Sequence, residues 1–487
     1  MSAEISVVDC LGLLASKVAP NVFDLSSGQY HVSLRDQIVR GRLLVGDIIS
    51  MDPDFSSLLV VGGGVAGLAV AVAAADAGKQ VVVLEKSRYP LSKQVGVHSR
   101  FVGPFMYEWP WKFSRSQVYP PVDATCWPKF TGCPTLTAPD PISAAEFAKQ
   151  VGLWFNAALA AHPRLHLAVK LSASLQDRVR AYLKKGFSNA GMLDLTDMNW
   201  HRDSVPLVSI KPAYIILAAG MGAENCSLPE HDGKKIVRGR LFRGTPFWEN
   251  DRLRECADSG HDVVVVGGGD GALQDALRAL TSDEHPLQTL RKLECCPVVK
   301  ANLEGIGDRL QTIELQGRLM ASWRWNPAVF ESVDSLCSEV ARKIAKKRRV
   351  RAAVLKVLRP RKASGSQKVT LLVKSDYFDK AYLLNRFLMH LIRHVLKIAH
   401  SMGEAHDRIA LDVVFNAAVE GVQSRSANRF TVHYRGDHGR GTVDAAYVAV
   451  RFGVDKKTIP GLQMVHLSGD DQKQRTSLSR VPLPYAV

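Results

Sequence analysis

The sequence has little that would indicate a disulfide scaffold, a zinc site or a secreted protein. Its 487 residues include only 8 cysteines, which are scattered and form no C-x-x-C pair. This density and spacing favour free thiols. The N-terminus lacks the charged region, apolar core and small-residue cleavage site of a signal peptide, so we expect a cytoplasmic protein.

Acidic residues are missing from one long stretch. Residues 340–362 carry eleven Lys or Arg and no Asp or Glu, which accounts for +11 of the net charge of +16. One interpretation is a surface for an acidic partner or nucleic acid. The other, which we favour, is a solvated helix face on an insertion. Its inward-facing residues would be Ile344, Val350, Val354, Leu355 and Leu358.

The strongest motif runs from Leu58 to Glu85 and predicts a strand, a tight turn, a helix and a second strand. Gly62, Gly64 and Gly67 follow the spacing G-x-G-x-x-G of a dinucleotide site. The first glycine permits the turn, the second lets backbone approach a pyrophosphate, and the third lets the helix lie close to the strand.

Glu85 ends the second predicted strand, 23 residues after Gly62, where a carboxylate can bind ribose hydroxyls. The apolar stretch is also long enough for a transmembrane helix. Three consecutive glycines, Asp76 and a following lysine exclude that reading, so we expect no membrane span.

The segment after Glu85 is dense in aromatic residues and prolines. It could line a cofactor or substrate region, or it could be an aromatic minicore that holds a long loop. His98, Arg100 and Tyr107 are the candidate catalytic or flavin-edge residues in it. A capped helix over 139–162, a strand over 165–171 and a strand over 213–222 are expected to follow.

A second glycine motif occupies residues 261–280, with Gly267, Gly269 and Ala272 at the fingerprint positions. Asp270 would place a carboxylate in the phosphate turn, where its charge repels a pyrophosphate unless it faces away. The site therefore either binds a nucleotide or is a fold element that no longer does.

A strand is expected at residues 288–293, ending at Glu294, which favours NAD(H). Arg291 and Lys292 instead favour the 2′-phosphate of NADP(H), so the choice stays open.

The C-terminal part predicts a long helix over 377–400, then strands over 409–415, 430–434 and 443–452 with a hairpin turn at 435–441. His390 and His394 are four residues apart, as metal ligands on a helix can be. No carboxylate stands at a matching position, so we expect surface or boundary histidines and no metal site.

Two glycine motifs 205 residues apart, the AAG strand between them and a β-rich return resemble the flavoproteins with two dinucleotide-binding domains. That group includes pyridine-nucleotide disulfide reductases and flavin-dependent monooxygenases. The resemblance implies FAD at the first motif and NAD(P)H at the second. The implied FAD contacts are Gly62, Gly64, Val65, Ala66, Gly67, Glu85, Lys86, Ala218, Ala219 and Gly220. The implied NAD(P)H contacts are Gly267, Gly269, Ala272 and Glu294. In HLSGDDQ, Asp470 would lie near the ribityl chain, or in an ordinary polar turn.

The expected fold class is α/β, with a Rossmann-like FAD-binding domain, a second inserted Rossmann-like NAD(P)-binding domain and a helical, basic insertion. The expected parts are an N-terminal extension (1–55), the FAD-binding domain (56–250), the NAD(P)-binding-like domain (251–330), the insertion (331–407) and a return to the FAD-binding domain with a C-terminal tail (408–487).

The expected function is an FAD-dependent oxidoreductase that uses NAD(P)H and passes electrons to oxygen or a small organic substrate. A monooxygenase-like reaction is preferred because no C-x-x-C or C-x(4)-C dithiol is present. One alternative is an FAD-only oxidase with a non-binding second site. Another is a nucleotide-sensing or partner-binding protein that uses the 340–362 segment for contact. The sequence leaves the oligomeric state open.

Overall fold

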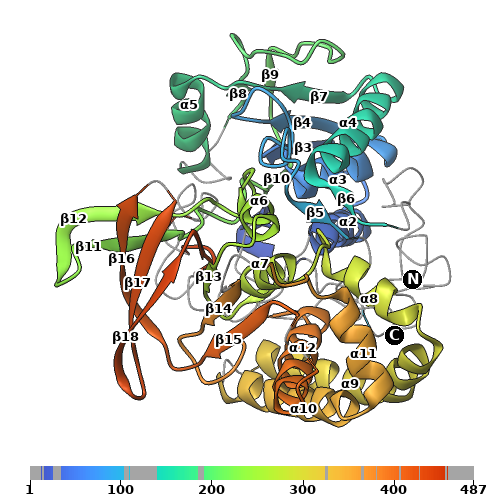
Figure 1. The fold of residues 1–487 in the computed structure, drawn as a ribbon. Helices are drawn as coiled ribbons and strands as arrows, with labels where there is room; N and C mark the ends of the chain where they lie inside the picture. Colours follow the sequence, from blue (N-terminus) through green and yellow to red (C-terminus); the bar gives the residue numbers. More distant parts are fainter. Residues whose placement is uncertain are drawn as a thin grey trace.

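Figure 1 shows the chain in a computed structural model, which describes residue 13 and residues 16–25, 34–103, 109, 140–184, 191–323, 327–362, 367–379, 381–404, 407–426, 428–455 and 458. Among these residues, two mainly parallel sheets form separate α/β units, and an antiparallel sheet lies against the second unit (Figure 1). The predicted α/β fold class with two Rossmann-like units is confirmed.

The first sheet has the strand order β1-β2-β10-β3-β4-β7 and is parallel except for the β1–β2 hairpin at its edge. Its strands are β1 (Lys17–Ala19), β2 (Val22–Asp24), β3 (Ser57–Val61), β4 (Gln80–Leu84), β7 (Leu165–Ala168) and β10 (Tyr214–Leu217). β3 is buried along its whole length because both sheet faces are covered. Such strands appear in sequence as continuous apolar runs, which made β3 and β4 easy to predict.

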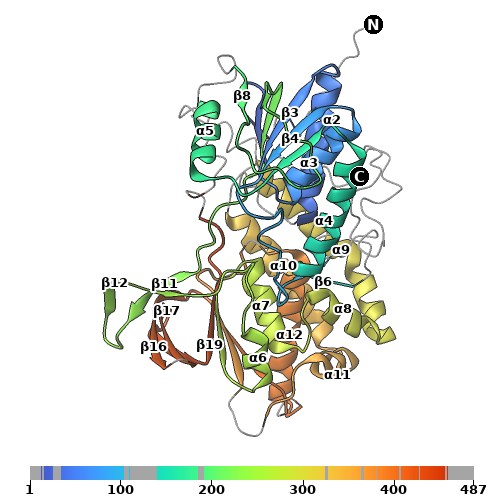
Figure 2. The same cartoon turned by 90° about the horizontal axis from the view of Figure 1, so that it is seen from above.

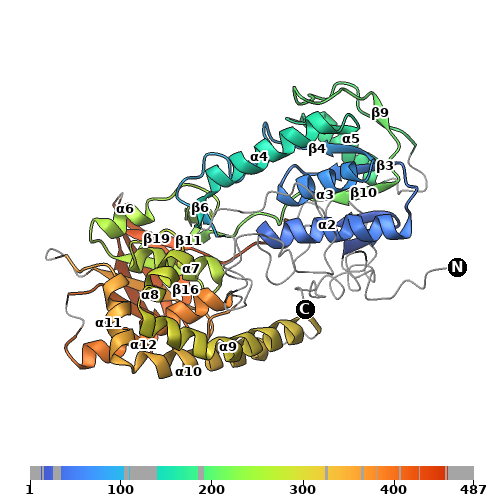
Figure 3. The same ribbon diagram turned by 90° about the vertical axis from the view of Figure 1, so that its right-hand side faces the viewer.

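Helices α2 (Leu34–Met51), α3 (Val65–Asp76) and α4 (Ala144–Ala161) cover one face of this sheet (Figure 3). The other face packs on α5 (Ala173–Lys184) and the segment that carries β8 (Leu193–Asp194) and β9 (Ser209–Ile210). β1, β2 and α2 all come from residues 1–55. The segment predicted as an N-terminal extension therefore supplies the edge of the first sheet and a helix against α3.

α4 begins as the capping pattern predicts. The Ser143 hydroxyl accepts a hydrogen bond from the backbone N–H of Glu146 at 3.2 Å. Ahead of the helix, β6 (Ile142–Ser143) pairs with β5 (Phe101–Val102). This pairing holds the loop after β4 against the start of α4.

The second sheet is fully parallel, with the order β15-β14-β13-β19. Its strands are β13 (Val263–Val266), β14 (Lys368–Leu372), β15 (Ala410–Val414) and β19 (Tyr447–Val450). Its helices are α6 (Leu253–Asp258), α7 (Asp270–Leu280), α8 (Pro286–Glu294), α9 (Pro297–Trp323), α10 (Pro327–Ala345), α11 (Arg348–Val357) and α12 (Leu383–Ser401). The helical insertion thus starts at α8 and not at residue 331, and it separates the neighbouring strands β13 and β14.

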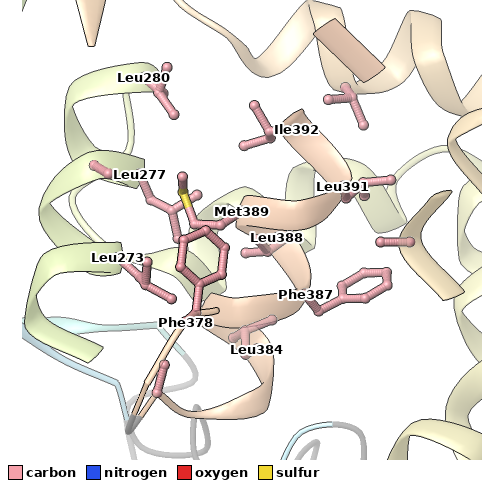
Figure 4. Packing of buried hydrophobic residues seen from close by; sticks show 14 of the residues in the cluster. Leu273, Leu277, Leu280, Phe378, Leu384, Phe387, Leu388, Met389, Leu391 and Ile392 are labelled. Atoms are coloured by element: carbon pink, nitrogen blue, oxygen red, sulfur yellow. The ribbon is translucent and has the colours of Figure 1, made fainter. Parts of the chain in front are cut away.

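The core of this unit lies between α7 and α12 (Figure 4). Leu273 and Leu277 of α7 face Leu384 and Leu388 of α12, with Phe378 beside them. Complete burial of each such side chain contributes about 1.5–3 kcal/mol. The helix predicted over 377–400 is α12, which begins at Leu383, and its apolar face anchors the insertion to the sheet.

The third sheet is antiparallel apart from the β11–β16 pair and has the order β12-β11-β16-β17-β18. Its strands are β11 (Ser227–His231), β12 (Ile236–Arg243), β16 (Ala418–Ser426), β17 (Arg429–Gly436) and β18 (Gly439–Ala445). The predicted hairpin is confirmed, because Gly436 pairs with Gly439 across the turn.

Val422 and Val432 of the third sheet pack on Val264 and Val266, on the face of the second sheet opposite the helices. Figure 2 shows this sheet to one side of the second unit. β15 and β19 complete the second sheet, and β16 to β18 cover it. This arrangement differs from the predicted return of residues 408–487 to the FAD-binding domain, because the apolar faces of these strands are needed by the second core.

Among the helices that the structure describes, none combines the length and the apolar character needed to cross a bilayer.

Candidate dinucleotide-binding sites

The first glycine turn joins β3 to α3 and has no room for larger residues at two positions. Gly62 has a φ of +116°, and a Cβ there would lie 2.2 Å from the carbonyl oxygen of Ala218. A Cβ on Gly67 would lie 2.0 Å from the carbonyl oxygen of Gly62. Both approaches involve backbone atoms that cannot move away easily. The turn against β10 and the close packing of α3 therefore require these glycines, as their spacing predicts.

Gly64 differs from the other two glycines because its Cα faces open space. Among the residues that the structure describes, none would come within 4 Å of a Cβ there. Gly64 is the extended N-cap residue of α3, and it makes no side-chain cap. The N–H groups of Val65, Ala66 and Gly67 lack intrahelical acceptors by helix geometry. An uncapped helix N-terminus with space in front of it fits the pyrophosphate of a dinucleotide.

Glu85 directly follows β4, as predicted for a ribose-binding acid. Its Oε2 accepts a hydrogen bond from the N–H of Gly63 at 2.7 Å, and its Oε1 accepts one from the N–H of Ser87 at 2.6 Å. These bonds hold the buried carboxylate beside the glycine turn. Each oxygen keeps a lone pair that a ribose hydroxyl can use. Lys86, the next residue, is exposed. The residues at this edge of the sheet therefore fit the ADP part of FAD.

Two linkers connect the α/β units and pair with each other. Residues 218–226 leave β10, and residues 451–455 follow β19. Glu224 forms a bridge with Val454, and the N–H of Asn225 donates to the carbonyl of Gly453 at 2.8 Å. The small residues Ala218, Ala219 and Gly220 open the first linker. They lie beside the first glycine turn, where the resemblance places them.

The second glycine turn, between β13 and α7, repeats the first. Gly267 has a φ of +137°, and a Cβ there would lie 2.4 Å from the carbonyl oxygen of Arg451. Gly269 is the extended N-cap residue of α7 and makes no side-chain cap. Ala272, at the third fingerprint position, is completely buried. Each glycine turn thus packs on one of the two linkers.

Asp270 points away from the second turn. Its carboxylate accepts hydrogen bonds from the backbone N–H of Tyr382, the N-cap residue of α12, at 3.1 Å and from the side chains of Asn385 at 2.5 Å and Gln274 at 2.9 Å. Burial raises the pKa of Asp270 to about 6, although these hydrogen bonds oppose the rise. The residue connects α7 to α12, which explains an acid at this position.

The predicted strand at residues 288–293 is wrong. Pro286–Glu294 is helix α8, which starts at a capping box formed by His285 and Gln288. Leucines at 287, 290 and 293 are all buried, with the spacing of one helix face. Glu294 ends this helix, and Arg291 pairs with Asp140. Glu294 is therefore not at the end of a strand beside the second turn.

The second strand of this unit is β14, and the residue that follows its end was missed. The N–H of Gly267 donates to the carbonyl of Leu372 at 2.9 Å, so the end of β14 lies against the glycine turn. Val373 is buried there, and Lys374 is exposed. The apolar run VTLLV at residues 369–373 was the available signal. It was overlooked because a helical insertion, and not a single helix, separates it from the turn.

Arg100 lies in a buried ionic cluster, away from any open surface. It pairs with Asp251 at 2.5 Å and with Asp275, to which Arg278 and Arg451 also bind at 3.0 and 2.8 Å. Burial alone would raise the pKa of Asp275, but the three arginines hold it well below its usual range. The cluster joins the loop after β4 to α7 and to the second linker. Arg100 is thus a positioning residue.

Of the other two candidate catalytic residues, the structure describes only His98. His98 is exposed, and its backbone N–H donates to the side-chain oxygen of Asn250 at 2.7 Å. This bond also ties the loop after β4 to the segment before α6. Tyr107 lies outside the described residues, as does Asp470.

The histidines of α12 have ordinary partners. His390 Nε2 lies 2.8 Å from Asp334 Oδ1, which also pairs with Arg386. His394 Nε2 lies 3.0 Å from the Ser338 hydroxyl. The predicted surface or boundary position is wrong for His390, which is 1% exposed. Within the described part of the chain, no group of three metal-ligating side chains occurs.

The first glycine turn, its acid and its small-residue neighbour strand have the arrangement of an FAD-binding site, and comparison with protein families agrees. Residues 57–205 match the family model described as "DAO: FAD dependent oxidoreductase". The match starts at β3 and includes the first turn and Glu85. It confirms the predicted resemblance to FAD-dependent oxidoreductases for this part of the chain, and it supports FAD as the cofactor.

A search of curated protein sequences finds no match. Among solved structures, the chain is similar to the bacillithiol disulfide reductase Bdr (YpdA) from Bacillus cereus, with 12% identity, a TM-score of 0.36, and coverage of 85% of this chain and 82% of that one. It is also similar to the thioredoxin reductase of Lactococcus lactis in its FR conformation, with 10% identity, a TM-score of 0.34, and coverage of 82% and 78%. TM-scores this low support no inference about activity.

Proposed function

We propose that the protein is an FAD-dependent oxidoreductase in which NAD(P)H reduces the flavin, and in which the electrons pass to oxygen or a small organic substrate. One observation carries this proposal. Two glycine turns, each at a helix N-terminus with no side-chain cap from its N-cap residue, pack on the two paired linkers. Both nucleotide turns therefore adjoin the connection between the two units.

FAD supplies the hydride and electron-transfer chemistry when bound. The chain's part is to bind and orient. The first N–H groups of α3 would hold the FAD pyrophosphate, and Glu85 would hold the ribose. Gly267 and Gly269 would admit the pyrophosphate of NAD(P)H. The cluster around Asp275 fixes the orientation of the units, because it ties the loop after β4 to α7 and to the second linker.

The positions of the cysteines bear on which electron acceptor the flavin uses. Disulfide reduction requires a pair of reactive cysteines at the flavin. The sequence has no C-x-x-C or C-x(4)-C pair. The adjacent Cys295 and Cys296 follow α8, which ends beside the amino ends of the second sheet's strands, at the edge opposite the Gly267 turn. We therefore favour a monooxygenase-like reaction over disulfide reduction.

Lys374 makes NADPH the expected donor. In this fold the end of the second strand meets the ribose that carries the 2′-phosphate of NADP(H). An exposed lysine at the end of β14 attracts that phosphate, whereas an acid there would favour NAD(H).

Gly64→Ala tests the FAD site without disturbing the fold. A Cβ there meets no atom of the described residues within 4 Å, so the variant should fold normally. The methyl group would occupy space that the pyrophosphate needs, so the purified variant should lose bound flavin. Gly152→Ala is the matched control, because a Cβ at this position on α4 also meets no described atom within 4 Å. Normal flavin content in Gly64→Ala would contradict the assigned pyrophosphate position.

An FAD-only oxidase is the second candidate, and the surroundings of the second turn favour it. Two neighbours lie close to this turn. A Cβ on Gly268 would lie 2.7 Å from Val373, and Asp270 holds α12 against the start of α7. In that case the substrate itself reduces the flavin. Saturable binding of NADPH would argue against the oxidase.

A further inference from the structure

We propose that the protein has a third binding site, for a small phosphorylated organic anion, at the edge of the second sheet opposite the Gly267 turn. A cavity of about 640 Å³ lies there. Its walls come from the segments that precede β13, β14 and β15 and from the ends of α8 and α11. Two sequence features that the flavin reaction does not use, the basic segment and the adjacent cysteines, meet in this cavity.

The charge of the cavity is strongly positive. Five cationic side chains and one acid line it: Lys292, Lys356, Arg359, Lys362, Arg408 and Asp258. Lys292 pairs with Asp283, and Arg359 pairs with Asp258. Lys356 and Lys362 are exposed. The unbalanced positive charge lies on these two lysines and on Arg408. Arg408 pairs with Asp407 at 3.5 Å, and water screens this pair because the Asp407 side chain is 72% exposed. An anion would balance it.

Two arginines of the wall keep unused donors. Arg359 is 6% exposed, and within the described residues its buried Nε has no hydrogen-bond partner. The Nε of Arg408 is also buried and has no hydrogen-bond partner among the described residues. Buried guanidinium groups with an unpaired donor are costly, and an anion held beside them offsets that cost. Arg359 and Arg408 line the cavity as buried and partly buried cations, which distinguishes it from a surface patch of solvated lysines.

The wall segment is held firmly. The N–H of Arg359 donates to Leu280 at 2.9 Å, and the N–H of Ile409 donates to the carbonyl of Arg359 at 3.2 Å. The side chain of Gln367 accepts from the N–H of Lys362 at 2.9 Å and donates to Ala257. A rigid frame of this kind lets a ligand bind without a large loss of conformational entropy.

The size and the remaining lining indicate an organic ligand. Known ligand sites have volumes of about 300–1,000 Å³, and their walls are mainly apolar with a few polar groups. Here Ala353, Val357, Leu358 and Pro360 supply apolar wall between the cations. A free inorganic ion would leave this surface uncovered. FAD and NAD(P)H are not the expected ligands, because the glycine turns lie at the carboxyl ends of the strands.

Cys295 provides a reporter inside the cavity. It is exposed and lines the cavity next to Lys292. The experiment alkylates the full-length flavin-bound protein with uncharged N-ethylmaleimide and measures the rate at Cys295 by peptide mass spectrometry. The probes are fructose 1,6-bisphosphate and inorganic pyrophosphate, with sodium chloride at matched ionic strength.

We expect fructose 1,6-bisphosphate to protect Cys295 saturably, and at lower concentration than pyrophosphate. Lys356→Gln and Lys362→Gln should each weaken this protection about tenfold, the factor expected for a charge-assisted hydrogen bond. Lys346→Gln is the control, because this exposed lysine belongs to the same basic segment but does not line the cavity. Protection by pyrophosphate at the same or a lower concentration than by fructose 1,6-bisphosphate, equal protection by chloride, or an equal effect of Lys346→Gln would overturn the proposal.

Discussion

Replacing Asp270 by asparagine should stabilise the protein at alkaline pH. The carboxylate is completely buried between α7 and α12, and burial raises its pKa from 3.8 to about 6. A raised pKa of an acid means that folding favours the protonated form. The contribution of Asp270 to stability is therefore greatest below pH 4, falls between pH 4 and 6, and stays low above pH 6.

The size of the effect follows from the shift in pKa. A rise from 3.8 to about 6 corresponds to about 3 kcal/mol of stability that is lost at pH 8. Asparagine cannot ionise, and its carbonyl can still accept from the N–H of Tyr382 and from Asn385. The variant should therefore gain up to about 3 kcal/mol at pH 8, and this gain should fall to about 1 kcal/mol at pH 4.5.

The assay is thermal unfolding of the FAD-bound protein at pH 8 and at pH 4.5. The melting temperature of Asp270→Asn should exceed that of the wild type by roughly 3 °C at pH 8. Asp275→Asn is the control on the same helix. The three arginines lower the pKa of Asp275, so this variant should be less stable than the wild type at pH 8. A lower melting temperature for Asp270→Asn at pH 8 would refute the argument.

Two further predictions concern the nucleotide donor and the linkers. Lys374→Glu should lower the preference for NADPH over NADH by about tenfold or more, because a charge-assisted phosphate contact contributes about 1.5–3 kcal/mol. Equilibrium titration with each nucleotide measures this preference. An unchanged preference would show that Lys374 does not belong to the site. Arg451→Met leaves part of the Asp275 charge uncompensated and should destabilise the protein by about 3–5 kcal/mol. An unchanged urea midpoint would show that the cluster does not hold the linker.

The first unit could be predicted from sequence because its signals are local. β3, the glycine turn, α3 and β4 follow one another without interruption, and each is specified by apolar periodicity or by a backbone clash that only glycine avoids. The same holds for the cap at Ser143 and for the hairpin at residues 436–439. These elements need no distant partner to be recognised.

The second unit could be predicted only in part because its signals are separated. β14 pairs with β13, although α8 to α11 lie between them in the chain. The strand predicted after α7, at residues 288–293, is therefore helix α8. The acid at Asp270 was recognised as unusual, but its partners Tyr382 and Asn385 lie more than a hundred residues away. Nor could sequence alone show that Lys356, Arg408 and Cys295 share one cavity, because three separate segments bring them together.

The most direct test of the proposed reaction is the visible absorption spectrum of the purified protein, recorded anaerobically before and after addition of NADPH and then of NADH. We expect an oxidised flavin spectrum that NADPH bleaches at lower concentration than NADH. A colourless protein that cannot be reconstituted with FAD would contradict the central claim. A flavin spectrum that neither nucleotide changes would contradict the assignment of the second glycine turn to NAD(P)H.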